Sequence, residues 1–302
     1  MNIVQRTIMH FVRKGSFDFL PDKLYLKLVY FARMWKHLDL KNPCTMDEKL
    51  QWLKLYDKNP KYTKLVDKYA VREYIADLLG EEYLIPLLGA WDDPEDIDFN
   101  ALPNQFVLKC NHNSGRGMCI CRDKAKLDVT QVKEDLRKGL SQDYYLTGRE
   151  WPYKNIRRRI IAEKYMTDSP DSVEFTDYKF YCFNGYVDCV MCCYERSTGN
   201  PKFYFFDRNW ELRRYNKRGK EAPEGFTMPK PKNMDKMFEI AEKLSEDVGA
   251  AFLRVDLYNS CGQIYFGELT FFPGSGFEPN RLPETDRYFG DLIKLDERGG
   301  HK

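Results

Sequence analysis

Two apolar segments near the C-terminal end carry polar residues at alternate positions, and this pattern constrains the fold more than any other feature of the chain. The first segment, LRVDLY, places Arg254, Asp256 and Tyr258 on one face of a strand, because successive side chains of a strand point to opposite sides. The second segment, IYFGELT, follows after a short turn and places Glu268 and Thr270 together. We therefore expect an antiparallel strand pair with polar side chains between apolar ones.

The carboxylates of this strand pair have two interpretations. Polar groups among apolar neighbours are costly unless they are paired or bind a cation. Asp256, Glu268 and the hydroxyl of Thr270 would form an oxygen-rich site suited to Mg²⁺ that carries phosphates. Alternatively, Arg254 pairs with the carboxylates across the strands on a solvated face, which requires no ligand. Read alone, these residues favour neither interpretation.

Strand and helix patterns alternate irregularly along the rest of the chain. The apolar periodicity predicts helices over 24–35, 46–56, 61–79, 129–140 and 234–248, with Gly80 ending the third of them. Runs typical of strands cover 83–88, 106–110, 118–121, 159–165, 178–183, 187–194, 202–206, 251–258 and 263–271. Hairpins mixed with helices favour an α+β fold with antiparallel sheet over a regular βαβ array.

The charge balance and the cysteines limit the classes of partner and compartment. Among 302 residues, 48 basic side chains face 46 acidic ones, which gives no basic excess for a nucleic-acid partner. Nine cysteines, an odd number that lies mostly in strand-like runs, favour buried thiols in a reducing compartment. The N-terminal stretch has no uninterrupted apolar core, so we expect a cytoplasmic protein whose basic, apolar helix over 24–35 could contact a membrane surface.

A second candidate site lies where the segment FVLK ends at Lys109 and the loop NHNSGRG follows. Gly115 and Gly117 let backbone N–H groups turn toward phosphate oxygens, and Lys109 adds a positive charge. The residue order differs from that of a Walker A loop, in which Gly-Lys-Ser/Thr opens a helix. An ordinary hairpin turn explains the same residues and stays open as an alternative.

Two further segments combine acids with bases. The apolar run IIAEKYM carries Glu163 at its end, where a carboxylate and free backbone groups can hydrogen-bond an adenine edge. A surface pair between Glu163 and Lys164 is the alternative. Downstream, Asp177 and Lys179 fall on one face of the next predicted strand.

Together and in this order, these segments resemble the ATP-grasp superfamily: a lysine strand, a small-residue loop, an apolar strand ending in Glu, then Arg-x-Asp and Glu-x-Asn-x-x-Pro-Gly. The last element is ELTFFPG here, with Thr270 in place of the usual Asn. The segments DEKLQWLKLYD (47–57), LVDKYAVR (65–72) and DYKFYCFNG (177–185) closely resemble the TupA-like branch. The resemblance extends from about residue 42 to residue 295.

This resemblance implies an ATP-grasp fold, in which two α+β subdomains enclose ATP. An N-terminal helical segment would cover residues 1–60, and the ATP-grasp domain would cover 61–302. Within that domain, the nucleotide-binding subdomain would lie near 100–165 and the metal-binding subdomain near 175–295.

The resemblance also implies a role for each candidate residue. Arg254 and Lys109 would be catalytic, and Asp256, Glu268 and Thr270 would bind Mg²⁺. The nucleotide would contact Lys68, Lys109, Asn111, His112, Ser114, Gly115, Gly117, Glu163, Lys164, Tyr165, Met166, Asp177 and Lys179.

Members of the TupA-like branch are associated with teichuronopeptide, capsule and other bacterial surface polysaccharide synthesis. The resemblance implies an ATP- and Mg²⁺-dependent carboxylate–amine ligase that acts through an acyl phosphate. Its substrates would be a small-molecule or saccharide carboxylate, such as a uronic acid, and an amine or amino acid. Peripheral contact with a membrane-bound glycan assembly would suit such a role.

Three other functions stay open. Members of the branch are often labelled glycosyltransferases, but the one Asp-x-Asp, Asp96-Ile97-Asp98, lies in an acidic, loop-like stretch. A kinase acting on a sugar would use the same lysines and carboxylates, and a nucleotide-binding scaffold would need no turnover. Of the four histidines, His112 alone lies in a motif, which leaves little for Ser–His or Cys–His catalysis.

Overall fold

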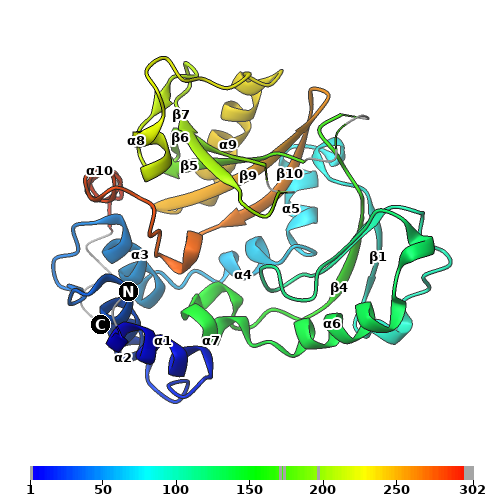
Figure 1. The fold of residues 1–302 in the computed structure, drawn as a ribbon, viewed down its shortest axis with the longest axis horizontal. Helices are drawn as coiled ribbons and strands as arrows, with labels where there is room; N and C mark the ends of the chain where they lie inside the picture. Colours follow the sequence, from blue (N-terminus) through cyan, green and yellow to red (C-terminus); the bar gives the residue numbers. More distant parts are fainter. Residues whose placement is uncertain (1–2, 170–171, 173–174, 196–197, 296–302) are drawn as a thin grey trace.

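The computed structural model describes residues 3–169, 172, 175–195 and 198–295 and contains two antiparallel sheets. Figure 1 shows the larger sheet above and the smaller sheet below and to the right, with α4 (Lys61–Val66) and α5 (Val71–Leu78) in the region between them. The predicted α+β arrangement with antiparallel strands is therefore confirmed. Within the described residues, no helix is both long and apolar enough to cross a bilayer.

The larger sheet has six strands in the order β10-β9-β5-β6-β7-β8. These strands are β5 (Asp177–Phe183), β6 (Tyr186–Tyr194), β7 (Lys202–Phe206), β8 (Leu212–Arg213), β9 (Phe252–Ser260) and β10 (Gln263–Thr270). Both neighbours of β5 are antiparallel to it, so Lys179 lies beside Asp256 of β9 on one side and Met191 of β6 on the other.

The smaller sheet has four strands in the order β1-β4-β2-β3. They are β1 (Leu87–Trp91), β2 (Phe106–Cys110), β3 (Cys119–Cys121) and β4 (Ile160–Lys164). The 3₁₀ turns η1 (Glu81–Tyr83) and η2 (Pro94–Asp96) flank β1, and η3 (Lys124–Lys126) precedes α6 (Val129–Ser141). Val107 of β2 pairs with Glu163 of β4, which puts Lys109 and Glu163 on neighbouring strands.

The remaining helices pack around the two sheets. At the N-terminal end are α1 (Ile3–Arg13), α2 (Asp22–Met34) and α3 (Met46–Tyr56). Between β3 and β4 of the smaller sheet come α7 (Tyr144–Gly148) and η4 (Trp151–Tyr153) in sequence, and the larger sheet carries α8 (Lys217–Glu221), α9 (Met234–Val248), η6 (Pro273–Ser275) and α10 (Pro283–Leu292). The start signal of α3 forms a capping box, in which Thr45 accepts from the Glu48 backbone and Glu48 accepts in return.

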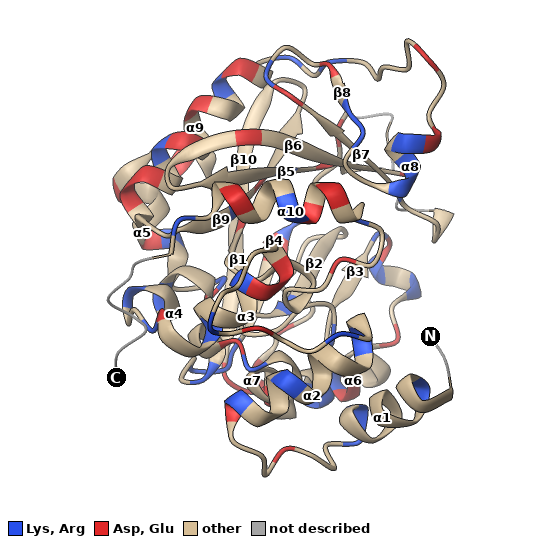
Figure 2. Ribbon diagram, turned by 90° about the vertical axis from the view of Figure 1, so that its left-hand side faces the viewer, with Lys and Arg blue, Asp and Glu red and all other residues tan. Residues whose placement is uncertain are grey.

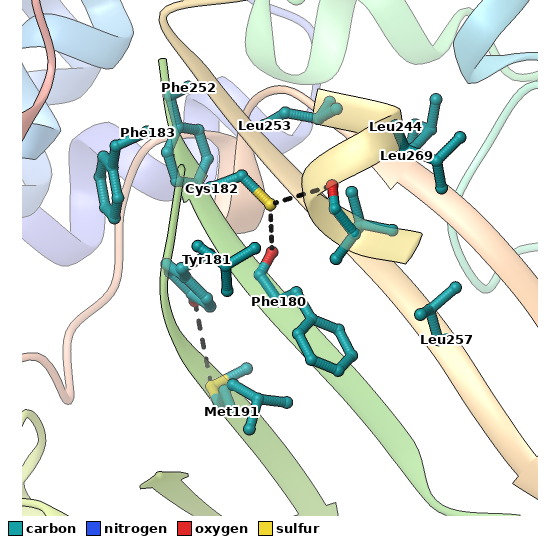
Figure 3. Packing of buried hydrophobic residues seen from close by; sticks show 14 of the residues in the cluster. Phe180, Tyr181, Cys182, Phe183, Met191, Leu244, Phe252, Leu253, Leu257 and Leu269 are labelled. Carbon is teal, nitrogen blue, oxygen red and sulfur yellow. Dashed lines mark hydrogen bonds between the residues drawn. The ribbon is translucent and has the colours of Figure 1, made fainter. Parts of the chain in front are cut away.

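The core of the larger sheet forms between its strands and α9. Met237, Phe238 and Leu244 of α9 are buried at helical spacing, and Phe238 packs edge-on against Phe180 of β5 with 5.0 Å between ring centroids. Figure 3 shows Cys182 in this cluster, with its thiol directed toward the carbonyl of Phe180. All nine cysteines are free thiols, as their number and positions predicted.

The single helix predicted over residues 61–79 is wrong, because the chain breaks into α4 and α5 at Asp67. Asp67 has extended backbone angles, and its carboxylate accepts from the backbone N–H groups of Tyr69 and Ala70. A side chain that satisfies nearby N–H groups offers the backbone an alternative to the helix. The strand predicted over 83–88 also begins later, at Leu87, after the turn η1.

Candidate active site

The hairpin of β9 and β10 brings the two predicted metal-binding carboxylates face to face. Its turn has positive φ at Cys261 and Gly262, as a tight two-residue hairpin turn requires. The register then shifts at a bulge between Phe266 and Glu268, so that Glu268 lies opposite Asp256 and not opposite Val255. Because directly opposed residues share a face, the extra residue puts both carboxylates on one side of the sheet.

Arg254 joins the carboxylates and the hydroxyl that the sequence singled out. Its Nε donates to Asp256 Oδ1 at 2.6 Å, and Nη2 donates to Asp256 Oδ2 at 2.7 Å. The same Nη2 lies 3.2 Å from Glu268 Oε1 and 3.1 Å from Thr270 Oγ1. The cross-strand Arg–carboxylate pair and the cluster of oxygen ligands, which the sequence left as alternatives, are therefore the same group of residues.

Lys179 extends the cluster onto the neighbouring strand. Its Nζ lies 2.6 Å from Asp256 Oδ2 and 3.2 Å from Asp177 Oδ2. Asp256 and Asp177 are almost fully buried, with 2% of each side chain exposed. Buried charges are tolerated when they are paired in this way, so the structure does bring Asp177 and Lys179 to the same place as Asp256.

The smaller sheet and the α4–α5 junction supply two more lysines. Lys109 at the end of β2 lies 2.5 Å from Glu163 of β4, and Arg72 of α5 lies 3.6 Å from the same carboxylate. Lys68, in the break between the helices, donates to the Asn113 carbonyl at 2.7 Å and lies 3.8 Å from Glu268 Oε2. Lys68 thus connects the loop after β2 to the β9–β10 hairpin.

These positive charges control the protonation of Glu268. Burial would raise its pKa, but the charges of Lys68, Arg254 and Lys179, together with that of Lys109, outweigh burial and lower the pKa to about 2. Burial lowers the pKa of Lys68, which the Glu268 carboxylate opposes. Glu268 is therefore ionised at neutral pH, and about a third of its side chain is exposed, so it can reach a ligand.

The residues present fit a magnesium ion that is shared with phosphates. No group of three or more His, Cys, Asp or Glu side chains gathers around one point in the described part of the chain. Mg²⁺ usually takes one or two carboxylates and completes its shell with water and substrate phosphates, so a cage of protein ligands is not required. Asp256, Glu268 and the Thr270 hydroxyl supply oxygen donors of that kind, and four cations beside them would suit phosphate oxygens.

The loop after β2 divides into a buried part and an exposed part. The Asn111 side chain has a structural role, because its amide group donates to Asp67 and to the Arg157 carbonyl and accepts from the Arg159 backbone N–H. His112 is buried with Nε2 3.1 Å from the Gln142 carbonyl, and burial lowers its pKa.

Beyond these two residues the same loop opens to solvent. Ser114 and Gly115 are exposed, and Gly115 has φ of +82°. Gly117 is packed so closely that a Cβ would lie 2.9 Å from Gly139 Cα. The exposed residues are placed where a loop could close over phosphates, whereas Asn111 and His112 hold its base; the nucleotide contacts predicted for all of them stay predictions.

The predicted adenine-binding residues lie at the end of β4. Glu163 forms an ion pair with Lys109, so its carboxylate is directed toward a residue that was predicted to bind phosphate. Lys164 is exposed, and its backbone N–H donates to the Pro86 carbonyl. The Tyr165 hydroxyl accepts from Arg122 at 3.2 Å, and Met166 follows in the partly exposed chain. Their contact with adenine stays a prediction.

Sequence reasoning missed a buried polar group next to this site. Lys54 of α3 is almost fully buried and donates to the carbonyls of Gly148 and Ser275, each at 2.8 Å, and to Gln51 at 3.0 Å. Ser275 in turn donates to Glu150 at 2.6 Å. The negative charges of Glu150 and Glu268 both raise the pKa of Tyr144, which places Glu150 near the carboxylate cluster. The available signal was a lysine four residues after Leu50, on the apolar face of the predicted helix.

The Asp-x-Asp of the glycosyltransferase alternative lies apart from these residues. Asp96 ends the turn η2 after β1, Ile97 is buried, and Asp98 accepts from the Asn100 backbone at 2.9 Å. The interpretation of this stretch as loop is correct, and the motif caps a turn.

Comparison with known proteins yields low-identity matches among solved structures. The D-alanine–D-alanine ligase from Helicobacter pylori shares 13% identity over 83% of this chain and 70% of that chain, with a TM-score of 0.44. The enzyme of that name from Bacillus anthracis, complexed with ATP, shares 15% identity over 76% of this chain and 63% of that chain, with a TM-score of 0.45. The ATP-grasp ligase PsnB, complexed with minimal precursor, Mg and ADP, shares 13% identity over 82% and 65%, with a TM-score of 0.39.

No curated protein sequence matches this chain. The model of one protein family, described as TupA-like ATPgrasp, matches residues 48–294, which is most of the sequence. This match confirms the resemblance and the expected ATP-grasp fold. The chain therefore belongs to the TupA-like ATP-grasp family of enzymes.

Proposed function

We propose that this protein is an ATP- and Mg²⁺-dependent carboxylate–amine ligase. The observation that carries the proposal is the cluster of two opposed carboxylates, Asp256 and Glu268, with cations contributed from both sheets. In the structure, Arg254 and Lys68 are paired with these carboxylates. A divalent cation on the carboxylates would take over that pairing and leave the cations to phosphate oxygens, so that metal and nucleotide bind together.

The ligase reaction consists of two transfers. A substrate carboxylate oxygen attacks the γ-phosphorus of ATP, forming an O–P bond as the bond to the β–γ bridging oxygen breaks and ADP leaves. An amine nitrogen then attacks the acyl carbon, the C–O bond breaks with release of inorganic phosphate, and the amine proton passes to solvent or to the phosphate. Arg254 and Lys109 would stabilise the transferred charge, and bound Mg²⁺ would neutralise phosphate charge. Such chemistry depends on alignment and charge and needs no covalent nucleophile from the protein.

The substrate class follows from the family resemblance. We propose that the carboxylate belongs to a uronic acid or a related saccharide and that the amine is an amino acid or similar compound. The product would then be an amide on a precursor of a bacterial surface polysaccharide such as a capsule. The buried group of Lys54, Ser275 and Glu150 lies next to the carboxylate cluster, because the charges of Glu150 and Glu268 both raise the pKa of Tyr153. These polar side chains support the proposal that a polar acceptor binds on this side of the cluster.

The experiment that tests this proposal traps the activated carboxylate. The full chain is incubated with Mg-ATP, individual uronic acids and hydroxylamine, and both ADP and hydroxamate are measured. A ligase forms hydroxamate in step with ADP, and ¹⁸O supplied in the carboxylate appears in phosphate. With amino acids in place of hydroxylamine, the expected product is a new amide mass. A stable phosphosugar without hydroxamate would overturn the ligase in favour of a kinase, and cleavage of nucleotide sugars without ATP would overturn both.

Site variants connect the activity to the cluster. Glu268→Gln and Lys109→Met should lower the rate of ADP formation by about 100-fold or more, since each removes a preorganised charge. The matched controls are Glu246→Gln on the exposed side of α9 and Lys126→Met, which is 85% exposed. If the site variants turn over ATP as fast as these controls, the assignment of the cluster as the active site is wrong.

A further inference from the structure

The two N-terminal helices expose an unusual share of apolar surface. Among the described residues, six of the eleven large apolar or aromatic side chains that are exposed lie within residues 3–35. They are Ile3, Val4, Phe11, Phe19, Leu24 and Trp35, and Ile3 and Phe19 are each 80% exposed. Single exposed apolar residues are normal on protein surfaces, but a concentration of this kind indicates an interaction surface.

The same segment carries a positive charge that the rest of the chain lacks. Residues 3–36 contain seven Lys or Arg and two Asp or Glu, whereas the remaining chain contains 41 basic and 44 acidic residues. Figure 2 shows Lys and Arg on α1 and α2 at the lower end of the molecule, while acidic positions recur along α9 at the upper end. The net charge of the whole chain is therefore nearly neutral although its N-terminal end is basic.

On α1 the apolar and basic side chains form separate stripes. At about 100° per residue, Ile3, Val4 and Phe11 fall within about 100° of the helix circumference. Arg6 and Arg13 lie together on the adjoining side, and the stripe of α1 that packs inward, which includes the buried Met9, lies opposite the exposed apolar side chains. The helix thus has a core face and also a second, exposed apolar face beside a basic one.

The second helix repeats this arrangement. Leu24, Phe31 and Trp35 fall within about 40° of one another around α2, and Lys23 and Lys27 adjoin them. Leu24 and Trp35 are exposed, and the Phe31 and Trp35 rings contact each other at 4.8 Å. Between the helices, Phe19 protrudes from the connecting turn.

The inward faces of both helices are already used. The Tyr145 hydroxyl donates to Asp22 at 2.6 Å, and the Arg149 guanidinium contacts the Asp18 carbonyl at 2.8 Å and lies over the Tyr25 ring. These contacts attach the helix pair to the segment that also presents Glu150 near the active site. These contacts hold the helices in place, and the exposed apolar side chains take no part in them.

We propose that α1, α2 and the turn between them bind the surface of an anionic lipid bilayer. Helices with an exposed apolar stripe beside Lys and Arg lie in the interface plane, where the apolar residues enter the acyl boundary and the basic residues meet anionic headgroups. The positive charge of this end favours an anionic partner over a neutral or basic one, and the exposed apolar side chains beside that charge favour a bilayer surface over an acidic protein. The inference goes beyond the proposed reaction and does not depend on it.

Vesicle co-sedimentation of the full chain tests the proposal. We expect binding to vesicles of phosphatidylglycerol with phosphatidylcholine, weak binding to phosphatidylcholine alone, and a decrease with added salt because exposed charges are screened. The pair Lys23→Gln and Lys27→Gln should weaken binding about 30-fold, which corresponds to about 1 kcal/mol for each basic residue near an anionic surface. Phe19→Ser should weaken it about tenfold, through loss of apolar burial.

Matched controls separate docking from general surface effects. Tyr186→Ser replaces a residue that is 63% exposed at the start of β6, and Lys126→Gln removes an exposed charge elsewhere; both should bind as the unmodified chain does. All these positions are exposed, so thermal unfolding should be unchanged. The proposal is overturned if the chain does not bind anionic vesicles, or if Phe19→Ser and the lysine-pair variant bind them as the controls do. It is also overturned if Phe19→Ser abolishes self-association, measured by sedimentation velocity, and leaves vesicle binding unchanged.

Discussion

Replacing Gly267 by alanine should damage the carboxylate pair without touching a charged group. A Cβ at this position would lie 2.8 Å from the Tyr258 ring and 2.9 Å from the backbone oxygen of Asp256. The Tyr258 ring is stacked on Phe175 at 4.2 Å, so it cannot move aside freely. Relief must come from the β9 backbone at Asp256, or from loss of the bulge that directs Glu268 to the same face.

The expected size of this effect differs between stability and activity. Overpacking at one position costs about 1–3 kcal/mol of unfolding free energy, measurable by urea denaturation. A displacement of about 1 Å in a catalytic group can cost about 100-fold in rate, so kcat/KM for ATP should fall by about that factor. The matched control is Gly225→Ala. A Cβ added at Gly225 would meet open space, but the backbone there has φ of +73°.

That control should lose about 1–2 kcal/mol through left-handed backbone strain, with turnover unchanged because Gly225 lies in the loop before α9. A Gly267→Ala protein with kcat/KM within about twofold of the unmodified chain would show that the bulge does not position Glu268, and the reasoning above would fail.

Two further predictions concern stability. Lys54→Met should lower the unfolding free energy by about 2–4 kcal/mol at neutral pH, because it leaves the buried Gly148 carbonyl without its donor and the Ser275 carbonyl with only the 3.4 Å bond from Gln51; urea denaturation beside the exposed Lys126→Met measures this, and a loss below about 1 kcal/mol would contradict it. For Glu268 the folded pKa of about 2 lies below the unfolded value, so its stabilising contribution is present above about pH 4.5 and is lost as the pH falls toward 2. The stability difference from Glu268→Gln should shrink by about 1–2 kcal/mol across that window, allowing for screening of a partly exposed side chain; a difference that stays constant would disprove the low pKa.

Strong local patterns were sufficient to predict the framework of the larger sheet and its main helix. The strand at 202–206 and the helix Met234–Val248 have the predicted bounds, because alternation and helical periodicity are unbroken there. The same is true of β2 (Phe106–Cys110), which carries Lys109. The family resemblance, carried by motifs spread over most of the chain, was correct as well.

The helix break at Asp67 could not be predicted from local periodicity. Apolar residues continue at helical spacing through the break, but Asp67 turns its carboxylate to the Tyr69 and Ala70 backbone and to Asn111 of a distant loop. Asn111 is more than forty positions away, so its contribution appears only once the chain has folded. The break is what moves Lys68 out of a helix and to within 3.8 Å of Glu268.

The sequence alone singled out the residues that we propose to carry the chemistry: the alternation in two strands identified Arg254, Asp256 and Glu268 as an unusual set of polar groups. Only the tertiary structure decided that these groups meet. Residue spacing along a strand sets the face of each side chain within that strand, but the relative face of two strands depends on register. Here the register is set by one extra residue at Gly267, whose place in the pairing no local pattern specifies.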